Sequence, residues 1–220
     1  MTLALDTPHL KALVARIKAC RICRDQPLGK PLPHEPRPVL WPSSTAKILI
    51  ASQAPGTKVH LSGVPFTDAS GDRLRDWLGV SKDEFYDRRL FAITPMGFCF
   101  PGQDAKGADL PPRRECAPAW RAELMVAMPQ IELILTIGLY AQAWHIGPSG
   151  GCSLTDTVKD WQAIFARDQA PRVIPLPHPS WRNIGWAKRN PWFEMDLLPF
   201  LKTEIRSRID GIARNEIPKA

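Results

Sequence analysis

Short apolar runs alternate with amphipathic stretches along this chain. Four of the runs are typical of buried strands and lie at residues 47–52, 90–94, 133–137 and 172–176. Apolar residues at three- and four-residue spacing predict helices in other segments, among them 8–20, 119–128, 158–166 and 192–209. Strands that alternate with helices predict an α/β fold, here a three-layer α/β/α sandwich around a central four-stranded parallel sheet.

Local signals predict where some of these helices begin and end. Gly79 is a natural stop for the helix that carries Leu74 and Trp77. Residues 81–84 form a capping box that opens the next helix. We expect loops at 24–45, 53–70, 95–118 and 147–157. No repeat or linker interrupts the chain, so we expect one domain over residues 1–220, with a mobile tail at 209–220.

Composition narrows the class of protein. A chain of 220 residues with 44% hydrophobic residues is an ordinary globular domain. It has no apolar run of 18 residues for a membrane span and no secretory signal, so we expect a cytoplasmic protein without a membrane partner. We also expect a monomer. The net charge of +7 favours a polyanion such as nucleic acid, although a basic soluble enzyme explains the charge equally well.

Four of the five cysteines are spaced like metal ligands. Cys20 and Cys23 form a C-x2-C pair after the first predicted helix, Cys99 follows the second strand, and Cys116 precedes a helix. Without an export signal, a disulfide framework is not expected. Four thiolates can hold a zinc ion or a [4Fe–4S] cluster. Four unrelated cysteines remain the alternative.

Two short loops follow predicted strands at opposite ends of the sequence. Residues 53–56 read Gln-Ala-Pro-Gly after the first strand, and residues 178–180 read His-Pro-Ser after the last. Ligands of open α/β sheets bind at the carboxyl ends of the strands, so both loops are expected at one pocket. A Pro-Gly turn also lets backbone N–H groups approach a ligand closely.

Together, these loops and the four cysteines resemble the uracil-DNA glycosylase superfamily, most closely its iron–sulfur branch, family 4. The resemblance spans roughly residues 15–205. It implies a DNA repair enzyme that flips uracil out of single- or double-stranded DNA and hydrolyses the N-glycosidic bond, leaving an abasic site. It also implies a structural [4Fe–4S] cluster on Cys20, Cys23, Cys99 and Cys116. Cys152 has no counterpart in the family pattern.

The resemblance assigns roles within the pocket. Gln53, Ala54, Gly56 and Ser180 would surround the flipped base. Phe66, in a Pro-Phe element, would stack on it with roughly 1–3 kcal/mol of stabilisation, unless it is a core residue. His178 would be catalytic, because a donor at the base carbonyl oxygen stabilises the negative charge that grows there.

The residues after His178 are the predicted DNA contact. Trp181, Arg182 and Asn183 would form a loop that penetrates the stacked bases and holds phosphates. Lys188 and Arg189 would extend this surface along the backbone. The alternative is a solvated loop with packed tryptophan rings.

Two departures from family 4 put the substrate in question. Val59-His60 stands where the family has an acidic pair, and Thr94-Pro95 stands where an Asn reads the uracil edge. Asp68 is our candidate for the missing catalytic carboxylate and His60 the second choice; the alternative for Asp68 is a helix cap. A weakly active or non-catalytic binder of damaged or abasic DNA, and an unrelated cluster-bearing redox or nucleotide enzyme, remain competing functions.

Overall fold

A four-stranded parallel sheet forms the centre of the molecule. The computed structural model describes residues 6–147 and 153–215. The strands are β1 (Ile48–Ala51), β2 (Phe91–Ile93), β3 (Leu133–Ile137) and β4 (Arg172–Leu176). They are ordered β2-β1-β3-β4, and every neighbouring pair is parallel. The predicted sheet is therefore confirmed, with each strand within one residue of its expected bounds.

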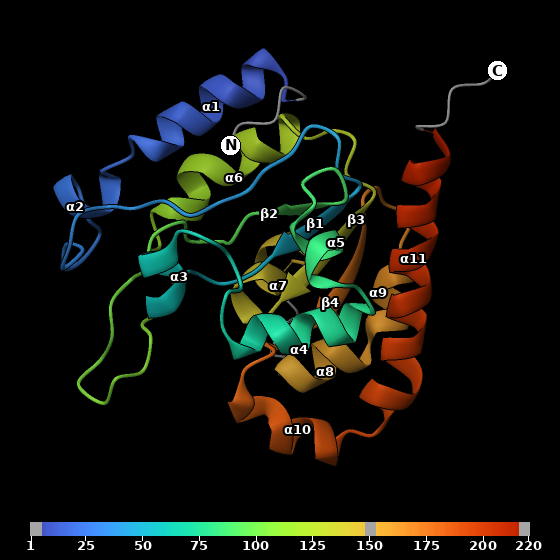
Figure 1. Cartoon of the computed structure of the whole chain (residues 1–220). Coiled ribbons are helices and arrows are strands. Elements are labelled where there is room, and N and C mark those ends of the chain that lie inside the picture. The colour runs from blue at the N-terminus through green and yellow to red at the C-terminus, as the bar shows by residue number, and fades with distance from the viewer. Residues whose placement is uncertain (1–5, 148–152, 216–220) are drawn as a thin grey trace.

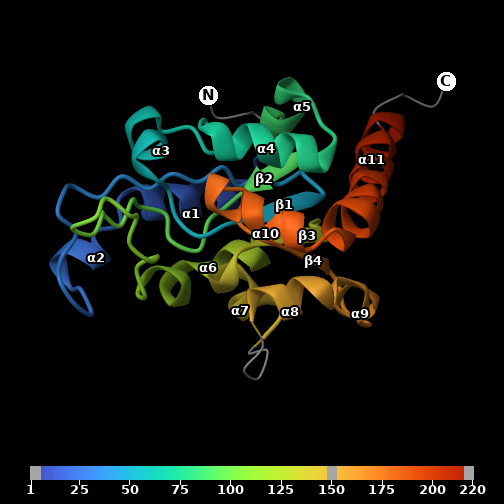
Figure 2. The same ribbon diagram turned by 90° about the horizontal axis from the view of Figure 1, so that it is seen from below.

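Helices cover both faces of the sheet, because its strands are apolar on both sides. Along β1, Ile48 and Ile50 enter one core while Leu49 and Ala51 enter the other. The first core contains α4 (Ala69–Leu78), α5 (Lys82–Tyr86) and α11 (Leu198–Asn215). The second contains α1 (Pro8–Lys18), α6 (Cys116–Val126) and α7 (Leu139–His145). Figures 1 and 2 show the resulting three layers, as predicted.

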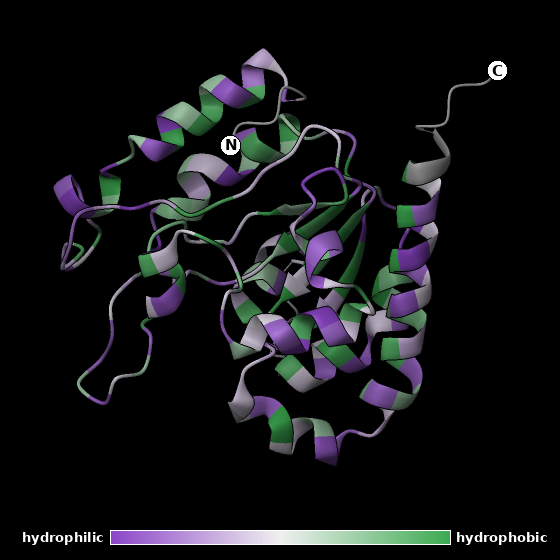
Figure 3. Cartoon of the chain, in the orientation of Figure 1, coloured by the Kyte–Doolittle hydropathy of each residue, from purple (hydrophilic) through white to green (hydrophobic). Residues whose placement is uncertain are grey.

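The remaining helices are short and lie around this sandwich. They are α2 (Ile22–Asp25), α3 (Thr57–Ser62), α8 (Leu154–Lys159), α9 (Trp161–Ala166) and α10 (Ile184–Arg189). A 3-10 turn spans Trp181–Asn183, and a π-helical segment over Phe193–Leu197 leads into α11. In Figure 3 the strands are mainly hydrophobic, whereas the helices carry both hydrophobic and hydrophilic residues, which fits burial of the sheet.

The predicted signals at the ends of α4 and α5 are confirmed. Gly79 ends α4 in the left-handed conformation, with a φ of 66° that a glycine adopts without strain. Ser81 and Glu84 form both bonds of the capping box at the start of α5.

Several predicted segments are wrong in their bounds. The expected loop at 53–70 contains α3, and the expected loop at 147–157 contains the start of α8, which Ser153 caps. The single helix expected at 158–166 is two helices that meet at Asp160. Short helices with few apolar repeats give too weak a periodicity to be found in sequence.

The C-terminal helix is longer than expected. It continues through Asp210 to Asn215, whereas the sequence predicted that the helix ends at residue 209. The physical reason is packing: Ile205 and Ile209 are buried against the first core, and Arg206 forms an ion pair with Glu84. Residues 216–220 lie outside the described part of the chain.

Within the described residues, no helix combines the length and the apolar character that a bilayer crossing requires.

Candidate active site

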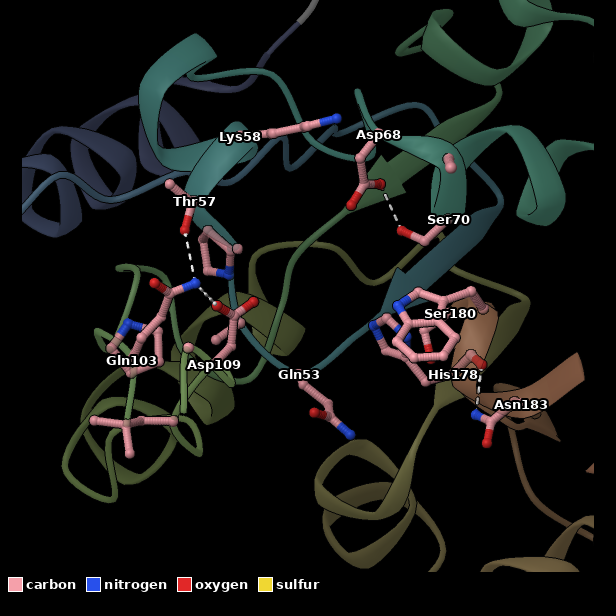
Figure 4. Close-up of a pocket in the computed structure, with 18 of the residues that line it drawn as sticks. Gln53, Thr57, Lys58, Asp68, Ser70, Gln103, Asp109, His178, Ser180 and Asn183 are labelled. Atoms are coloured by element: carbon pink, nitrogen blue, oxygen red, sulfur yellow. Dashed lines mark hydrogen bonds between the residues drawn. The ribbon is translucent and has the colours of Figure 1, made fainter. Parts of the chain in front are cut away.

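An open cleft of about 620 Å³ lies at the carboxyl end of the sheet. Its walls come from four segments far apart in sequence: the loop after β1, the start of α4, the loop 101–110 and the loop after β4. Figure 4 shows their side chains facing the cleft. The two predicted pocket loops therefore do meet at one site.

A smaller pocket of about 90 Å³ opens from this cleft. Phe66, Val59 and Pro95 are among its apolar walls. Seven residues border both cavities and so surround the mouth of the inner pocket: Ala54, Pro55, Gly56, Asp68, Ser70, Asp109 and His178. Three of the four polar side chains at this junction are titratable: the carboxylates of Asp68 and Asp109 and the imidazole of His178.

The loop after β1 is fixed by the loop after β2. The backbone N–H groups of Met96 and Gly97 donate to the carbonyls of Ser52 and Gln53, both at 2.8 Å. The Gln53 side chain lies against Gly138, where an added Cβ would stand 2.6 Å from its amide nitrogen. Gln53 therefore borders the outer cleft but not the inner pocket, whereas Ala54 and Gly56 border both.

Phe66 is a core residue, as the alternative predicted, and it also forms part of the wall of the inner pocket. Its side chain is 8% exposed and packs edge-on against Phe85 at 5.9 Å. Its φ is +54°, an uncommon conformation for an aromatic residue. The Phe66 carbonyl accepts from the Tyr86 hydroxyl at 2.9 Å and from Arg75 at 3.4 Å, and these bonds hold the strained backbone in place.

Asp68 is the N-cap of α4 and also borders the pocket. Its Oδ1 accepts from the Ser70 hydroxyl at 2.5 Å and from the Gly71 backbone N–H at 3.3 Å. The helix-cap alternative is thus realised in the same side chain that was predicted to be catalytic. The cap does not remove Asp68 from the site, because its carboxylate still faces the cleft (Figure 4).

His178 faces the same junction from the end of β4. Its backbone carbonyl accepts from the Asn183 side-chain amide at 2.7 Å, while no described residue hydrogen-bonds its ring. Burial lowers the pKa of His178, although the negative charges of Asp68 and Asp109 act in the opposite direction. The ring is therefore neutral at pH 7, with one N–H donor available to a ligand.

Sequence reasoning missed two polar residues that shape the cleft. Arg73, on α4, donates to the Ser180 carbonyl at 2.8 Å and so holds the loop after β4. Asp109 reaches the mouth of the inner pocket from the loop between Cys99 and Cys116. Neither residue lies in a motif. For Asp109, the one available signal was that an acidic residue lies in the loop between two predicted cysteine ligands.

The predicted DNA-contacting residues divide into two groups. Ser180, Trp181 and Asn183 border the cleft, and Trp181 is 73% exposed at its rim. Lys188 and Arg189 are exposed on α10 and do not border the cleft.

Arg182 and Trp186 belong to the same segment. The backbone of Arg182 lies in the 3-10 turn, but its side chain is outside what the structure describes. Trp186 is packed: its indole N–H donates to Thr155 at 2.8 Å, and its ring contacts Phe193. For Trp186, the packed alternative therefore describes the structure.

His60 lies outside both the cleft and the inner pocket. Its ring contacts His34, with 4.4 Å between the centroids, and Phe100. Burial lowers the pKa of His60. This position makes it unsuited to the water-activating role that was our second choice for it.

The four predicted ligand cysteines line one cavity. Cys20, Cys23, Cys99 and Cys116 are free thiols around a space with mainly apolar walls. Cys116 is the first residue of α6, which begins three residues earlier than expected, and its sulfur accepts from the Phe98 N–H at 3.4 Å. Burial raises the pKa of Cys99 to about 12 and raises that of Cys116, so both stay protonated unless a cation binds.

The arrangement of these sulfurs bears on the kind of metal. Among the described residues, no group of three or more His, Cys, Asp or Glu side chains is placed to hold a single metal ion. A [4Fe–4S] cluster binds each thiolate through a different iron, so its ligands stand further apart than those of one zinc ion. Four free cysteines around one apolar cavity offer a donor set that either a zinc ion or a [4Fe–4S] cluster takes. Cys152 lies outside the described residues.

The model of the uracil DNA glycosylase superfamily matches residues 40–202. The match includes both pocket loops, Cys99 and Cys116, and it leaves Cys20 and Cys23 outside. Because it covers most of the chain, this protein belongs to the uracil DNA glycosylase superfamily.

Proposed function

We propose that this protein flips uracil out of DNA and hydrolyses its N-glycosidic bond, leaving an abasic site. Membership of the superfamily supports a DNA glycosylase, and therefore DNA as the partner. One observation carries the finer proposal: a small pocket with Phe66 in its wall and His178 at its mouth opens from a cleft at the end of the sheet.

Base flipping explains why two cavities are needed. A base stacked in a duplex cannot reach a buried pocket, so the nucleotide must rotate out and enter it alone. In the proposal, the base enters the inner pocket against Phe66, while the sugar stays at the junction and the phosphates remain in the cleft. The fixed, strained backbone of Phe66 supports this because the ring is held in place before the base arrives.

His178 would stabilise the leaving base. When the bond between C1′ and N1 breaks, the electron pair goes to the ring and negative charge collects on its carbonyl oxygens. A neutral imidazole with a free N–H can donate to one of these oxygens as the charge grows. The ring has no other partner among the described residues, so no hydrogen bond is lost when it does so.

Asp68 would act on the other half of the reaction. Breaking the bond leaves positive charge on the sugar, and a nearby carboxylate stabilises that charge and orients water. The capping bonds from Ser70 and Gly71 fix Asp68 at the junction, which favours this electrostatic role.

The exposed residues beyond His178 would hold the DNA. Trp181 is placed at the rim, where its ring can fill the space that the flipped base leaves. Arg182, Lys188 and Arg189 would contact phosphates, with Arg73 positioning the loop from behind.

We also propose that Cys20, Cys23, Cys99 and Cys116 hold a [4Fe–4S] cluster. Such a cluster would supply structure and no redox step, because hydrolysis of a glycosidic bond transfers no electrons. It would tie the N-terminal segment to the loop after β2 and to the start of α6.

A second candidate function is tight binding of damaged or abasic DNA with little catalysis. Pro95 favours it, because this residue borders the inner pocket where family 4 has an Asn that reads the uracil edge. A pocket without that amide would hold uracil less selectively.

A single assay separates the two functions. The protein is incubated with a labelled oligonucleotide that contains one uracil, and abasic sites are then cleaved with alkali. A glycosylase gives one cut at the uracil, and His178→Ala gives far less. A wild-type protein that binds the uracil-containing DNA without producing alkali-labile sites would support the binder and refute the glycosylase.

A further inference from the structure

The mouth of the inner pocket carries a second carboxylate, Asp109, which no motif explains. If a base occupies the inner pocket, the C1′ atom lies where the two cavities join. Asp68 and Asp109 are the two carboxylates among the described residues that border both cavities. The attacking water must also reach C1′ at this junction, so its proton acceptor is one of these two side chains or bulk water.

The surrounding loop fixes Asp109 in place. Residues 102–110 fold back on themselves: the Leu110 N–H donates to the Gly102 carbonyl at 2.9 Å, and Asp109 pairs with Gln103. The Gln103 amide donates to Asp109 Oδ1 at 3.1 Å and to the Thr57 hydroxyl at 3.3 Å. The loop is thereby fastened to the start of α3 (Figure 4).

The other oxygen of Asp109 is available. A Cβ placed on Gly56 would lie 3.0 Å from Asp109 Oδ2, so the glycine allows this oxygen to approach the Pro-Gly turn. No described residue donates a hydrogen bond to Oδ2. Asp68, in contrast, accepts two hydrogen bonds from the first turn of α4. Asp109 caps no helix, and an exposed acid here repels the DNA phosphates that the cleft must hold.

We infer that Asp109 is the catalytic base of this site, with Asp68 as the fixed charge on the opposite side. The inference rests on the proposed glycosylase function. The bond between C1′ and N1 breaks with its electron pair on the base, and His178 donates to the resulting anion. The oxygen of water bonds to C1′ and its proton passes to Asp109 Oδ2. Solvent later protonates the released base and takes the proton from Asp109.

The first test compares carboxylate-to-amide variants in single-turnover assays on uracil DNA. Asp109→Asn keeps an oxygen for Gln103 but cannot accept a proton, so its rate should fall by about 10²–10⁴. DNA affinity should stay equal or rise, because a negative charge leaves the cleft. Asp83→Asn, at an exposed position in the first turn of α5, makes the same charge change elsewhere and should leave the rate unchanged.

The second test uses azide, which attacks C1′ without giving up a proton. In Asp109→Ala, azide should restore a large part of the rate and leave a C1′-azido sugar in the DNA, detected by mass spectrometry. In Asp68→Ala it should not. Full activity of Asp109→Asn, or a slow Asp109→Ala that azide neither restores nor labels, would overturn the inference. An inactive wild-type protein would instead refute the proposed function itself.

Discussion

Two of the walls of the cleft are built in different ways. One, which we call the strand-end wall, consists of residues 53–56 and 178–180, directly after β1 and β4. The other, the loop wall, consists of residues 101–110 between Cys99 and Cys116. The sheet itself fixes the first wall. The second depends on hydrogen bonds within one loop, and a cysteine lies beyond each of its ends.

The two walls therefore differ in how strongly their formation is coupled to folding of the sheet. Parallel strands bring their carboxyl ends together in any folded molecule, so the strand-end wall forms whenever the sheet does. The loop wall can form incompletely while the rest of the protein is folded. If the loop wall supplies the catalytic base, the state of the cysteine site affects the chemistry without any redox step.

A large effect is expected from the strand-end wall. His178→Ala should lower the single-turnover rate by about 10²–10³, the usual loss for one donor to a developing anion, with little change in DNA affinity. His9→Ala, at an exposed position on α1, is the matched control. Full activity of His178→Ala on uracil DNA would show that the strand-end wall carries no chemistry.

Loss of a cysteine tests the loop wall. Cys116→Ser should lose iron by elemental analysis and lose visible absorption. Its rate should fall by about 10²–10⁴, as for Asp109→Asn, while it still binds DNA. Cys152→Ser should keep both the iron and the rate. A colourless wild-type protein without iron would refute the cluster, and stoichiometric zinc would replace it.

The same contrast explains what the sequence could predict. Strand-end residues such as His178 could be found because a short apolar run followed by a polar loop indicates the carboxyl end of a buried strand. The cap of Asp68 was likewise foreseeable from its place before α4. Asp109 was not, because its position depends on a tertiary bond from Gln103. The direction of His60 also depends on packing, against His34, which local sequence does not encode.

Close packing behind Phe66 gives the next largest effect. A Cβ at Gly71 would stand 1.9 Å from the Phe66 carbonyl oxygen, so Gly71→Ala must displace that backbone. We expect a loss of about 1–3 kcal/mol in the free energy of unfolding by urea, together with reduced activity. Gly211→Ala on α11 meets no atom within 4 Å and should be neutral or stabilising. Equal stability of Gly71→Ala and wild type would contradict the close contact.

A phosphate contact beside the strand-end wall predicts a smaller change. Arg182→Ala should weaken DNA binding and reduce the slope of log affinity against log salt by about 1. Lys11→Ala, at an exposed position on α1, should leave the slope unchanged. If Arg182→Ala alters neither affinity nor slope, the loop after β4 does not hold phosphates.

The smallest effect concerns Arg121 and His145, which meet near the carboxyl end of β2. Arg121 is 1% exposed and donates to the backbone carbonyl of Thr94 at 2.7 Å, at the end of β2, and to His145 Nε2 at 2.8 Å. Burial, with the charge of Arg121, lowers the pKa of His145 from its usual 6.5 to about 3. The imidazole is therefore neutral in the folded state and accepts the bond from the guanidinium.

This pair makes stability depend on pH with a definite sign. Above about pH 6.5 His145 is neutral in both folded and unfolded chains, and the contribution to stability is fully present. As the pH falls from 6.5 toward 3, the unfolded chain binds a proton that the folded one excludes, so stability is lost. The slope from this group cannot exceed about 1.4 kcal/mol per pH unit, because the folded and unfolded chains differ by at most one proton at His145. Urea midpoints at pH 7, 6 and 5 measure it, with His145→Gln as the variant, since glutamine keeps an acceptor for Arg121. A slope in His145→Gln equal to that of wild type would show that acid weakens the molecule elsewhere, at groups such as His60 or His178, whose pKa burial also lowers.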